Sequence, residues 1–304
     1  MPKQDIDEDF VFSISYDFIT IFEMLMLCNM IYQKCLFIKL KGTKDMKDKV
    51  VVITGSTSGI GFGIASKFAK NGAKLVINGF ASPLEVQKLS KDLIAYGAGG
   101  VLFEGADLSK PIEIDSMFKN IIQKYNRIDV LVNNAGIQFV SPIEDFPPEK
   151  WEMILRVDLI AAFYTIKNVI PIMKKQQWGR VINIASAHAL VASPFKSAYV
   201  AAKHGMIGLT KSVALEVAES NITINSLCPG YVKTPLVMNQ IADTAKARSM
   251  SEEDVIKNVI LGVQATKKFV EIEEVADFVY FLASDSASSV TGAALSIDGG
   301  WTSQ

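Results

Sequence analysis

Residues 54–61 read T-G-S-T-S-G-I-G and connect a short apolar run to an amphipathic segment. The residues before this stretch predict a strand and those after it predict a helix, so the glycines lie in a strand-turn-helix unit. Glycine lets the backbone approach a ligand closely, and the free N–H groups at a helix N-terminus attract phosphate. The stretch therefore predicts a site for the pyrophosphate of a dinucleotide, formed by Gly55, Thr57, Ser58, Gly59, Ile60 and Gly61.

The spacing of these glycines is G-x-x-x-G-x-G and not G-x-G-x-x-G. A turn between a strand and a helix also uses glycine for its geometry alone, so a structural turn without a ligand is the alternative. The strand-turn-helix context favours the nucleotide site.

Strand and helix patterns alternate from this unit to the C-terminus. Apolar runs rich in β-branched residues are typical of parallel strands buried on both faces, and they occur at 50–54, 74–78, 101–104, 130–133, 181–185, 223–227 and 294–297. Amphipathic segments predict helices at 59–71, 83–96, 111–125, 149–175, 197–219 and 272–284. This order predicts an α/β domain with a single doubly wound parallel sheet, Rossmann-like, with right-handed crossovers and helices on both faces.

Residues 235–268 interrupt this alternation. The segment is polar and helical in pattern, and it is inserted between a strand and the last helix. Because ligands bind at the carboxyl edge of such a sheet, we expect the segment to form a small helical lid over the substrate. The alternative is a surface helical pair with no gating role.

The composition excludes several classes of function. The 304 residues are 49% hydrophobic and 21% charged, which is enough to bury a sizeable core. The formal net charge of −1 provides no basic surface for nucleic acid. Cys28, Cys35 and Cys228 are too few and too scattered for a disulfide framework or a zinc site. We therefore expect no metal and a reducing, cytoplasmic location.

Residues 1–45 differ from the rest of the chain. An acidic start is followed by an apolar stretch whose longest run without charge, 24–33, is shorter than the ~20 residues that span a bilayer, so we expect no membrane span. The segment contains no Arg and lacks the positive start of a secretory signal. We expect a poorly ordered or artefactual extension before a domain at 46–304. The alternative is an interfacial or partner-binding helix.

Three residues in the second half of the chain form a pattern with acid-base chemistry. Ser186 ends a predicted strand, and Tyr199 and Lys203 are four residues apart on a predicted helix, so they share a face. A phenol with an ordinary pKa of about 10 is a poor base near neutral pH, and a nearby ammonium lowers that pKa. Ser186 can donate a hydrogen bond to a carbonyl or alkoxide oxygen. With the glycine turn, the pattern predicts hydride transfer between a nicotinamide and a carbonyl or alcohol.

The residues after the second and third predicted strands bear on the choice of dinucleotide. Asn78-Gly79-Phe80 ends the second strand and lacks the acidic residue that binds the ribose of NAD. The same segment has no Arg or Lys for the 2′-phosphate of NADP, and this absence favours NAD. Asp107 follows the third strand, where it borders the adenine or, as an equal alternative, caps the next helix.

These motifs resemble those of the short-chain dehydrogenase/reductase family. The glycine turn, Asn133-Asn134-Ala135-Gly136, Ser186, Tyr199-x-x-x-Lys203 and Pro229-Gly230 agree in order and spacing, and the resemblance covers residues 47–304. Within the family, the chain resembles most the bacterial-type D-3-hydroxybutyrate dehydrogenases, in stretches that include 78–80, 136–138, 143–147, 184–188, 196–199 and 298–302.

The resemblance implies a cofactor site, a substrate site and an assembly. NAD would contact the glycine turn together with Phe80, Asp107, Leu108, Asn134, Ala135, Gly136, Tyr199, Lys203, Pro229, Gly230, Val232 and Thr234. A small carboxylate substrate would be bound by Gln138, Ser186, His188, Lys196, Tyr231, Gln240 and Trp301. Family members commonly form homotetramers, and we expect the helices at 149–175 and 197–219 to form the interface.

The polar members of the substrate set also have a physical rationale. Lys196 precedes Tyr199 by three residues and His188 follows Ser186 by two, so both can face the reacting centre. A cation with several hydrogen-bond donors suits a small carboxylate. The alternatives are a solvated Lys on a loop and a His satisfied by the backbone.

Two positions depart from the family pattern. Asp158 stands where the family usually has Asn, a residue that holds a water linked to the catalytic lysine. Asp keeps the shape but can add negative charge, raise the pKa of Lys203 and bind it away from Tyr199. We therefore place Asp158 with the catalytic residues Ser186, Tyr199 and Lys203, and we expect a slower enzyme. Tyr231 stands where the family has Trp over the substrate methyl.

We expect an NAD-dependent enzyme that oxidises D-3-hydroxybutyrate to acetoacetate and catalyses the reverse reaction. One alternative is a short-chain reductase for another small ketone or alcohol. The other is a catalytically impaired nucleotide-binding protein, which only Asp158 and the unusual N-terminus support.

Overall fold

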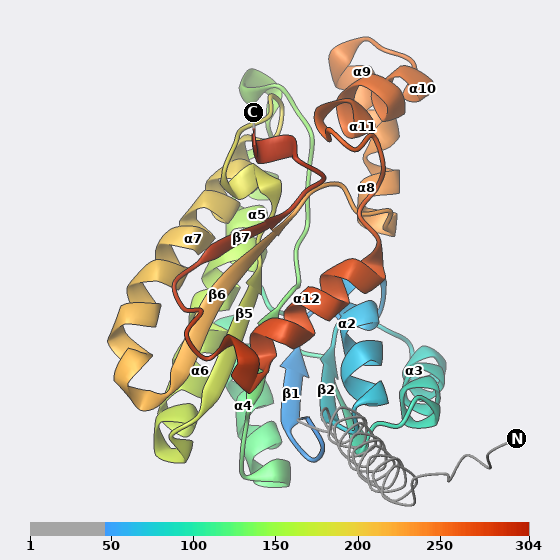
Figure 1. The fold of residues 1–304 in the computed structure, drawn as a ribbon. Coiled ribbons are helices and arrows are strands. Elements are labelled where there is room, and N and C mark those ends of the chain that lie inside the picture. Colours follow the sequence, from blue (N-terminus) through green and yellow to red (C-terminus); the bar gives the residue numbers. More distant parts are fainter. Residues whose placement is uncertain (1–45, 304) are drawn as a thin grey trace, which may run out of the picture. The chain divides into compact units, whose positions relative to one another are not determined.

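The computed structural model describes residues 46–303, and the expectations for residues 1–45 lie outside the described residues. The described residues form a parallel sheet in the order β3-β2-β1-β4-β5-β6-β7 (Figure 1). Its strands are β1 (Val50–Ile53), β2 (Lys74–Asn78), β3 (Gly100–Glu104), β4 (Val130–Asn133), β5 (Gly179–Ile184), β6 (Ile222–Pro229) and β7 (Ala294–Ile297). Every pair of neighbouring strands in this sheet is parallel, which confirms the predicted doubly wound arrangement.

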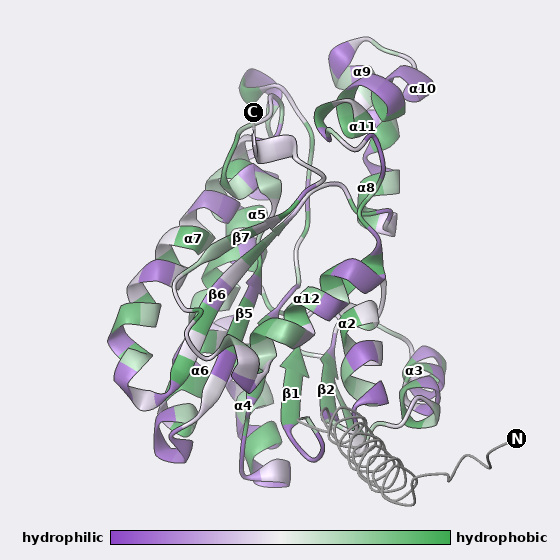
Figure 2. Cartoon of the chain, viewed as in Figure 1, coloured by the Kyte–Doolittle hydropathy of each residue, from purple (hydrophilic) through white to green (hydrophobic). Residues whose placement is uncertain are grey.

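Helices cover both faces of the sheet. One apolar cluster contains side chains of α2 (Gly59–Lys70), α3 (Pro83–Ala95) and α12 (Ile272–Ala283). A second cluster contains side chains of α4 (Pro111–Tyr125), α6 (Ala161–Gln176) and α7 (Ser197–Val217). The clusters are separate because successive side chains of a strand point to opposite faces. Figure 2 shows apolar residues along β1 and β2, with hydrophilic residues on the outer sides of the helices.

The central strand β1 shows how the two cores are built. Val51 and Ile53 pack in the cluster that contains Phe68 of α2, whereas Val52 packs in the cluster that contains Phe118 of α4. All of these strand residues are fully buried, which explains why the run is continuously apolar and not alternating.

The chain adds β2 and β3 to the sheet on one side of β1 and then adds β4 to β7 on the other side. Strand β1 pairs with β2 on one side and with β4 on the other, so the order of strands reverses there. In open parallel sheets such a switch point forms a crevice beyond the carboxyl ends of the strands. The glycine turn that follows β1 therefore lies where a ligand is expected.

The predicted continuous helix at 149–175 is wrong in one respect. The segment forms α5 (Pro148–Leu155), a π-helical turn η2 (Arg156–Ile160) and α6. A π turn inserts an extra residue into the helical hydrogen-bond ladder and is frequent at functional sites. Here the turn carries Asp158, whose side chain is fully buried.

The insertion between β6 and α12 is helical, as predicted. It contains α8 (Pro235–Asn239), α9 (Ile241–Arg248), α10 (Glu252–Asp254), the π-helical turn η5 (Val255–Ile260) and α11 (Leu261–Val263). Its apolar residues cluster with Tyr231, which follows β6, and with Trp301, which follows β7. The insertion therefore packs over residues beyond the carboxyl ends of these two strands. No helix within residues 46–303 has the length and apolar character needed to cross a membrane.

Candidate active site

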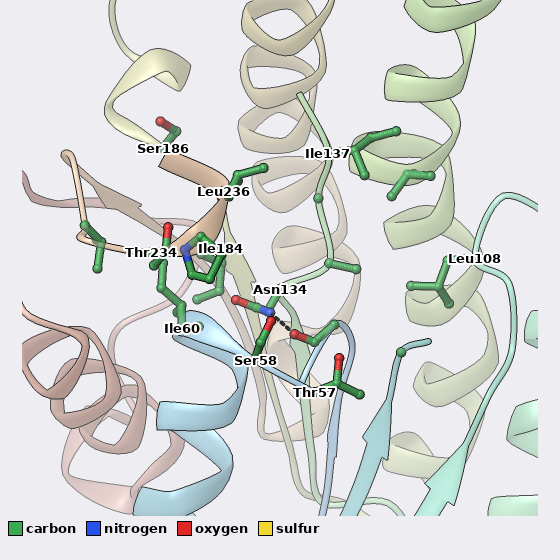
Figure 3. A pocket seen from close by; sticks show the side chains of 18 of the residues that line it. Thr57, Ser58, Ile60, Leu108, Asn134, Ile137, Ile184, Ser186, Thr234 and Leu236 are labelled. Carbon is green, nitrogen blue, oxygen red and sulfur yellow. Dashed lines mark hydrogen bonds between the residues drawn. The ribbon is translucent and has the colours of Figure 1, made fainter. Parts of the chain in front are cut away.

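A cavity of about 400 Å³ lies at the carboxyl ends of the strands (Figure 3). Leu108 and Ser186 lie on opposite sides of it, with Asn134 beside the glycine turn between them. Most of the predicted cofactor residues line this cavity: Gly55, Thr57, Ser58, Gly59, Ile60, Phe80, Asp107, Leu108, Asn134, Ala135, Gly136, Tyr199, Lys203, Pro229, Gly230, Val232 and Thr234. Gly61, the other predicted member, does not.

The glycine turn has the backbone geometry expected of a phosphate cradle. Gly55 and Gly59 have positive φ angles of 61° and 56°, a region that favours glycine. A Cβ on Gly61 would collide with the carbonyl oxygen of Gly55 and the side chain of Asn134. Gly61 therefore lets α2 approach the turn closely.

The N-terminus of α2 offers free N–H groups to an anion. Ser58, the N-cap residue, forms no capping hydrogen bond through its side chain, and the first turn contains no acidic residue. Such an end binds phosphate through unsatisfied N–H groups and the positive end of the helix dipole. The turn, the helix end and the elongated cavity together fit a nicotinamide dinucleotide.

Two asparagines brace the strand ends that support the turn. Asn134 donates to the carbonyl oxygens of Thr54 and Gly55, both at 2.9 Å. Asn78 donates to the carbonyl oxygens of Glu104, the last residue of β3, and Ala106 at 2.9 and 3.0 Å, and its Oδ1 lies 3.4 Å from the amide of Gly55. The sequence singled out Asn78 only as a residue that lacks charge, whereas the structure gives it a role in joining β1, β2 and β3.

Asp107 lines the cavity and does not cap a helix. Its Oδ1 accepts hydrogen bonds from the amide and the hydroxyl of Ser109, at 2.9 and 2.7 Å. Helix α4 begins after Lys110, so capping by Asp107, the alternative interpretation, is wrong. The hydrogen bonds from Ser109 hold the pKa of Asp107 below its ordinary value, so a carboxylate faces the cavity near Phe80, whose ring is 77% exposed.

The structure brings Ser186, Tyr199 and Lys203 to one wall of the cavity. Ser186 follows β5, and the other two residues lie one turn apart on α7. The Nζ of Lys203 lies 5.3 Å from the centroid of the Tyr199 ring and donates to the carbonyl oxygen of Ile184 at 3.0 Å. This arrangement places a hydroxyl donor, a phenol and a buried cation around one point, as the sequence predicted.

The pKa of Tyr199 reflects opposing influences. Burial raises it, and the positive charge of Lys203 lowers it. The negative charge of Asp158 raises it, and the hydroxyl of Ser186 lowers it, with a net result above the ordinary value. Further positive charge near the ring, or removal of the Asp158 charge, would therefore lower the pKa of Tyr199.

Asp158 forms a buried ion pair with Lys203. Its Oδ2 lies 3.4 Å from the Nζ of Lys203, and its Oδ1 accepts from the amide of Ile137 at 2.8 Å. Burial raises the pKa of Asp158 to about 6, against the lowering effect of Lys203. Burial lowers the pKa of Lys203, but the charges of Tyr199 and Asp158 raise it by more. The carboxylate thus holds the lysine protonated and opposes ionisation of the tyrosine.

Replacing Asp158 with Asn is expected to raise kcat for alcohol oxidation at about pH 8 by about three- to tenfold. Asn keeps the shape and an acceptor for the amide of Ile137, but it removes the charge that raises the pKa of Tyr199. Below about pH 6 the native carboxyl is protonated, so the two rates should converge there. A pH profile of kcat for both proteins measures this.

The matched control is Asp277→Asn, which removes a carboxylate that pairs with Lys67 on the surface. It should leave kcat unchanged across the profile. An Asp158→Asn rate equal to or below that of the native protein at pH 8 would contradict the account.

Next to this centre lies a buried cluster of polar side chains from the predicted substrate set. The Nζ of Lys196 lies 3.4 Å from the hydroxyl of Tyr231 and 3.4 Å from Oε1 of Gln240. Within residues 46–303, no hydrogen-bond partner is present for Nε2 of Gln138 or for Nε2 of His188, and both atoms are buried. Lys196, Tyr231 and Gln240 come from three separate segments and meet only in the folded chain.

The protonation states of this cluster suit an anionic ligand. Burial and the positive charge of Arg248 lower the pKa of Lys196 to about 8. Burial and the charge of Lys196 lower the pKa of His188 to about 3, so its imidazole is neutral. The ammonium of Lys196 therefore has neutral neighbours, which leaves its charge available for a carboxylate.

His188 is also the centre of an aromatic group. Its ring meets those of Tyr199, Tyr231 and Trp301 edge to face, with centroid distances of 5.9, 6.1 and 4.9 Å. Tyr231 and Trp301 stack on each other at 5.2 Å with an interplanar angle of 6°. Ser186 Oγ accepts from the amide of His188 at 3.1 Å, which links this group to the hydroxyl at the cavity wall. The stacked rings form an apolar wall beside the polar cluster.

A buried hydrogen-bonded chain below the site was not foreseen from the sequence. Thr165 donates to Asn133, which donates to Asn183, at 2.7 and 2.9 Å. Asn183 donates to Thr210 at 2.8 Å, and Thr210 lies 2.7 Å from Ser226. The chain ties α6 and α7 to β4, β5 and β6, so it fixes the helices that carry the ionisable groups of the site.

The site residues predicted from the sequence did not include Asn78 or several apolar wall residues that line the cavity as well: Gly79, Ala106, Ile137, Val157, Ile184, Ala185, Pro235, Leu236 and Val237. Pro235, Leu236 and Val237 belong to the inserted helical segment, whose place next to the cavity was expected. The others are ordinary strand-end and helix residues, and nothing in their local pattern distinguishes them from core.

Comparisons with known proteins agree with this site. A family model described as Enoyl-(Acyl carrier protein) reductase matches residues 55–302. The D-beta-hydroxybutyrate dehydrogenase of Rhizobium meliloti strain 1021 is 56% identical over 256 residues, which cover 84% of this chain and 99% of that protein. The D-beta-hydroxybutyrate dehydrogenase of Cupriavidus necator is 44% identical over 261 residues, which cover 85% and 100%.

A solved structure gives the same result for the fold. An actinorhodin polyketide ketoreductase variant with NADPH aligns with a TM-score of 0.79 at 30% identity, over 86% of this chain and 99% of that one. These similarities extend over nearly all of the described residues. The matched part includes the glycine turn and the arrangement of Ser186, Tyr199 and Lys203. The chain belongs to the short-chain dehydrogenase/reductase family of oxidoreductases.

Proposed function

We propose that this enzyme interconverts D-3-hydroxybutyrate and acetoacetate with NAD as the cofactor. The observation that carries the proposal is the buried ammonium of Lys196, which is 5% exposed and has only neutral hydrogen-bond partners beside the catalytic centre. A buried charge without a counter-ion is costly, so the site is completed by an anion. This requirement favours a small carboxylate over an uncharged ketone or alcohol.

The chain's own groups account for the proton transfer. Tyr199 takes a proton from the substrate hydroxyl during oxidation and returns it during reduction. Lys203 stabilises the phenolate, and Ser186 donates a hydrogen bond to the substrate oxygen. The nicotinamide supplies the chemistry of hydride acceptance and donation when it is bound. Lys203 also binds the cofactor ribose in this proposal.

The carboxylate of the substrate would be bound by the cluster of neutral donors and one cation. Lys196 contributes the charge, while Gln138 and His188 contribute buried polar atoms that lack protein partners within residues 46–303. Gln240 contributes through its contact with Lys196. The stacked rings of Tyr231 and Trp301 would cover the methyl end of the substrate.

The preference for NAD over NADP rests on the adenosine end of the cavity. Phe80, Asp107 and Leu108 line that end, and the lining residues within 46–303 include no Arg or Lys there. The Asp107 carboxylate would repel a 2′-phosphate and can accept from the adenine amine or the ribose. The two D-beta-hydroxybutyrate dehydrogenases that resemble the chain over most of its length support the choice of substrate.

The direct test is NADH formation by the full chain with D-3-hydroxybutyrate, compared with the L-enantiomer and with NADP. We expect turnover confined to the D-enantiomer and much faster with NAD. Activity on uncharged ketones but not on acetoacetate would instead favour a reductase of another specificity. Binding of NAD without any hydride transfer would favour the impaired nucleotide-binding protein.

The KM for acetoacetate is expected to rise as the pH increases through about 8. The lowered pKa of Lys196 means that its ammonium is charged below this pH and neutral above it, so attraction of the carboxylate is lost at high pH. Steady-state rates from about pH 6.5 to about pH 9.5 measure the trend. The uncharged analogue acetoacetamide should show no such rise, and an equal rise for both compounds would contradict the assignment.

Further features of the enzyme are proposals of the same kind. Residues 46–304 would form the catalytic domain, after the extension at 1–45, and the segment 235–268 would act as the substrate lid. A homotetramer would bury apolar side chains that α5 to α7 expose, namely Met153, Ile160, Phe163 and Leu215. A cytoplasmic location is consistent with Cys228, which is a free, buried thiol.

A further inference from the structure

Arg248, at the end of α9, is a half-buried cation that forms no ion pair with an acidic residue of the described part of the chain. Its guanidinium carbon lies 5.7 Å from the centroid of the Phe195 ring, directly before Lys196 in the chain. Among the ion pairs formed within residues 46–303, none includes Arg248 or Lys196. The inserted helical segment thus brings a second positive charge to the loop that carries the substrate-binding ammonium.

The charge of Arg248 acts on the substrate cluster. It lowers the pKa of Lys196, after the larger effect of burial. It also lowers the pKa of Tyr231, although burial raises that pKa to about 12. Both effects require the guanidinium to lie within electrostatic reach of the polar cluster.

The groups around Lys196 provide no negative charge to balance the two cations. His188 faces it from the loop after β5 as a neutral imidazole, and Tyr231 faces it from the loop after β6 as a neutral phenol. Gln240 faces it from between α8 and α9 as a neutral amide. Two like charges without a counter-ion repel each other, and an anion in the cluster would relieve the repulsion.

We propose that Arg248 is a second cation of the substrate site, a specificity-determining residue that attracts the substrate carboxylate and favours its transfer to Lys196. The inference rests on the proposed function and adds a residue on the inserted segment to the carboxylate site. Arg248 is partly exposed, whereas Lys196 is buried, so an anion from solvent can meet Arg248 first. The flat Phe195 ring suits a planar guanidinium better than a lysine ammonium.

Replacing Arg248 with Gln in the full chain tests the proposal. The KM for acetoacetate should rise by about three- to tenfold at neutral pH, and kcat should stay unchanged. The KM for acetoacetamide, which keeps the shape but lacks the charge, should not change. Increasing ionic strength should raise the KM of the native protein more than that of the variant.

The pH dependence of KM is a measurement that would not change if Arg248 had a purely structural role. Because Arg248 lowers the pKa of Lys196, its removal raises that pKa. The pH above which the KM for acetoacetate increases should therefore shift upward in Arg248→Gln. Arg248→Lys, which keeps the charge, should retain most of the native KM.

Lys246→Gln is the matched control, because it removes an exposed positive charge from the same helix. It should leave the KM for acetoacetate at the native value. An unchanged KM in Arg248→Gln, or an equal increase for acetoacetate and acetoacetamide, would overturn the proposal.

Failure of the proposed function is recognised separately, by absence of acetoacetate turnover in the native protein. In that case calorimetric titration of acetoacetate into the native and variant proteins, each with NAD present, still decides the role of Arg248. Weaker binding to Arg248→Gln alone would support the inference, and equal binding to native, Arg248→Gln and Lys246→Gln proteins would overturn it.

Discussion

Replacing Tyr199 with Phe is expected to lower kcat by about 10²- to 10⁴-fold in both directions. The substitution removes the hydroxyl that carries the proton and leaves the ring, which contacts His188 edge to face. Lys203 cannot take over the role, because its Nζ is held by Ile184 and Asp158 and its pKa is raised. The reaction then depends on water for proton transfer.

Three measurements separate this chemical effect from a loss of structure. NADH binding, followed by its fluorescence, should change little, since the glycine turn is untouched and Phe keeps the ring that lines the cavity. The melting temperature should stay close to that of the native protein. Tyr96→Phe, which alters a tyrosine exposed on the surface, should keep full activity. A kcat for Tyr199→Phe within a few-fold of the native value would show that another group transfers the proton.

Replacing Lys196 with Gln is expected to raise the KM for acetoacetate by about 10- to 100-fold, with a smaller effect on kcat. The charge-assisted hydrogen bond to the carboxylate is lost, and in this buried cluster no other group with a full charge makes direct contact with Lys196. Gln retains a polar end near Tyr231 and Gln240, so the fold of the loop should persist. The variant should also lose the increase of KM with pH.

Acetoacetamide distinguishes loss of charge recognition from damage to the site. Its KM should change little in Lys196→Gln, because it has no charge to lose. Lys211→Gln, an exposed position on α7, is the control for a change in net charge and should behave like the native protein. A similar rise of KM for the acid and the amide in Lys196→Gln would mean that Lys196 shapes the pocket and does not bind the carboxylate.

Asp158 connects these two predictions. It pairs with Lys203 and acts on the ionisation of Tyr199, and it makes no contact with Lys196. The Asp158→Asn change should therefore alter kcat and its pH profile, whereas the Lys196→Gln change should alter KM. A double substitution should give the product of the two separate effects if the sites act independently.

The glycine turn, the alternating strands and helices and the pair of Tyr199 and Lys203 could be predicted because each depends on local order. A buried parallel strand needs a continuous apolar run, and two residues four apart on a helix share a face whatever surrounds them. The same reasoning failed at η2, because an α-helix and a π turn have the same amphipathic pattern. It also left two interpretations of Asp107 open, because a carboxylate near a helix start can bond to the turn before the helix and not to the helix itself.

By itself the sequence determined the doubly wound fold, the place of the glycine turn and the chemistry of Ser186, Tyr199 and Lys203, because patterns within a few residues dictate these features. Only the tertiary structure decided which distant groups meet. The ion pair of Asp158 with Lys203 and the approach of Arg248 to the loop of Lys196 join elements far apart in the chain. The charge balance of the site depends on the distances between its buried charged groups, because water screens them only weakly there. No local sequence pattern specifies those distances.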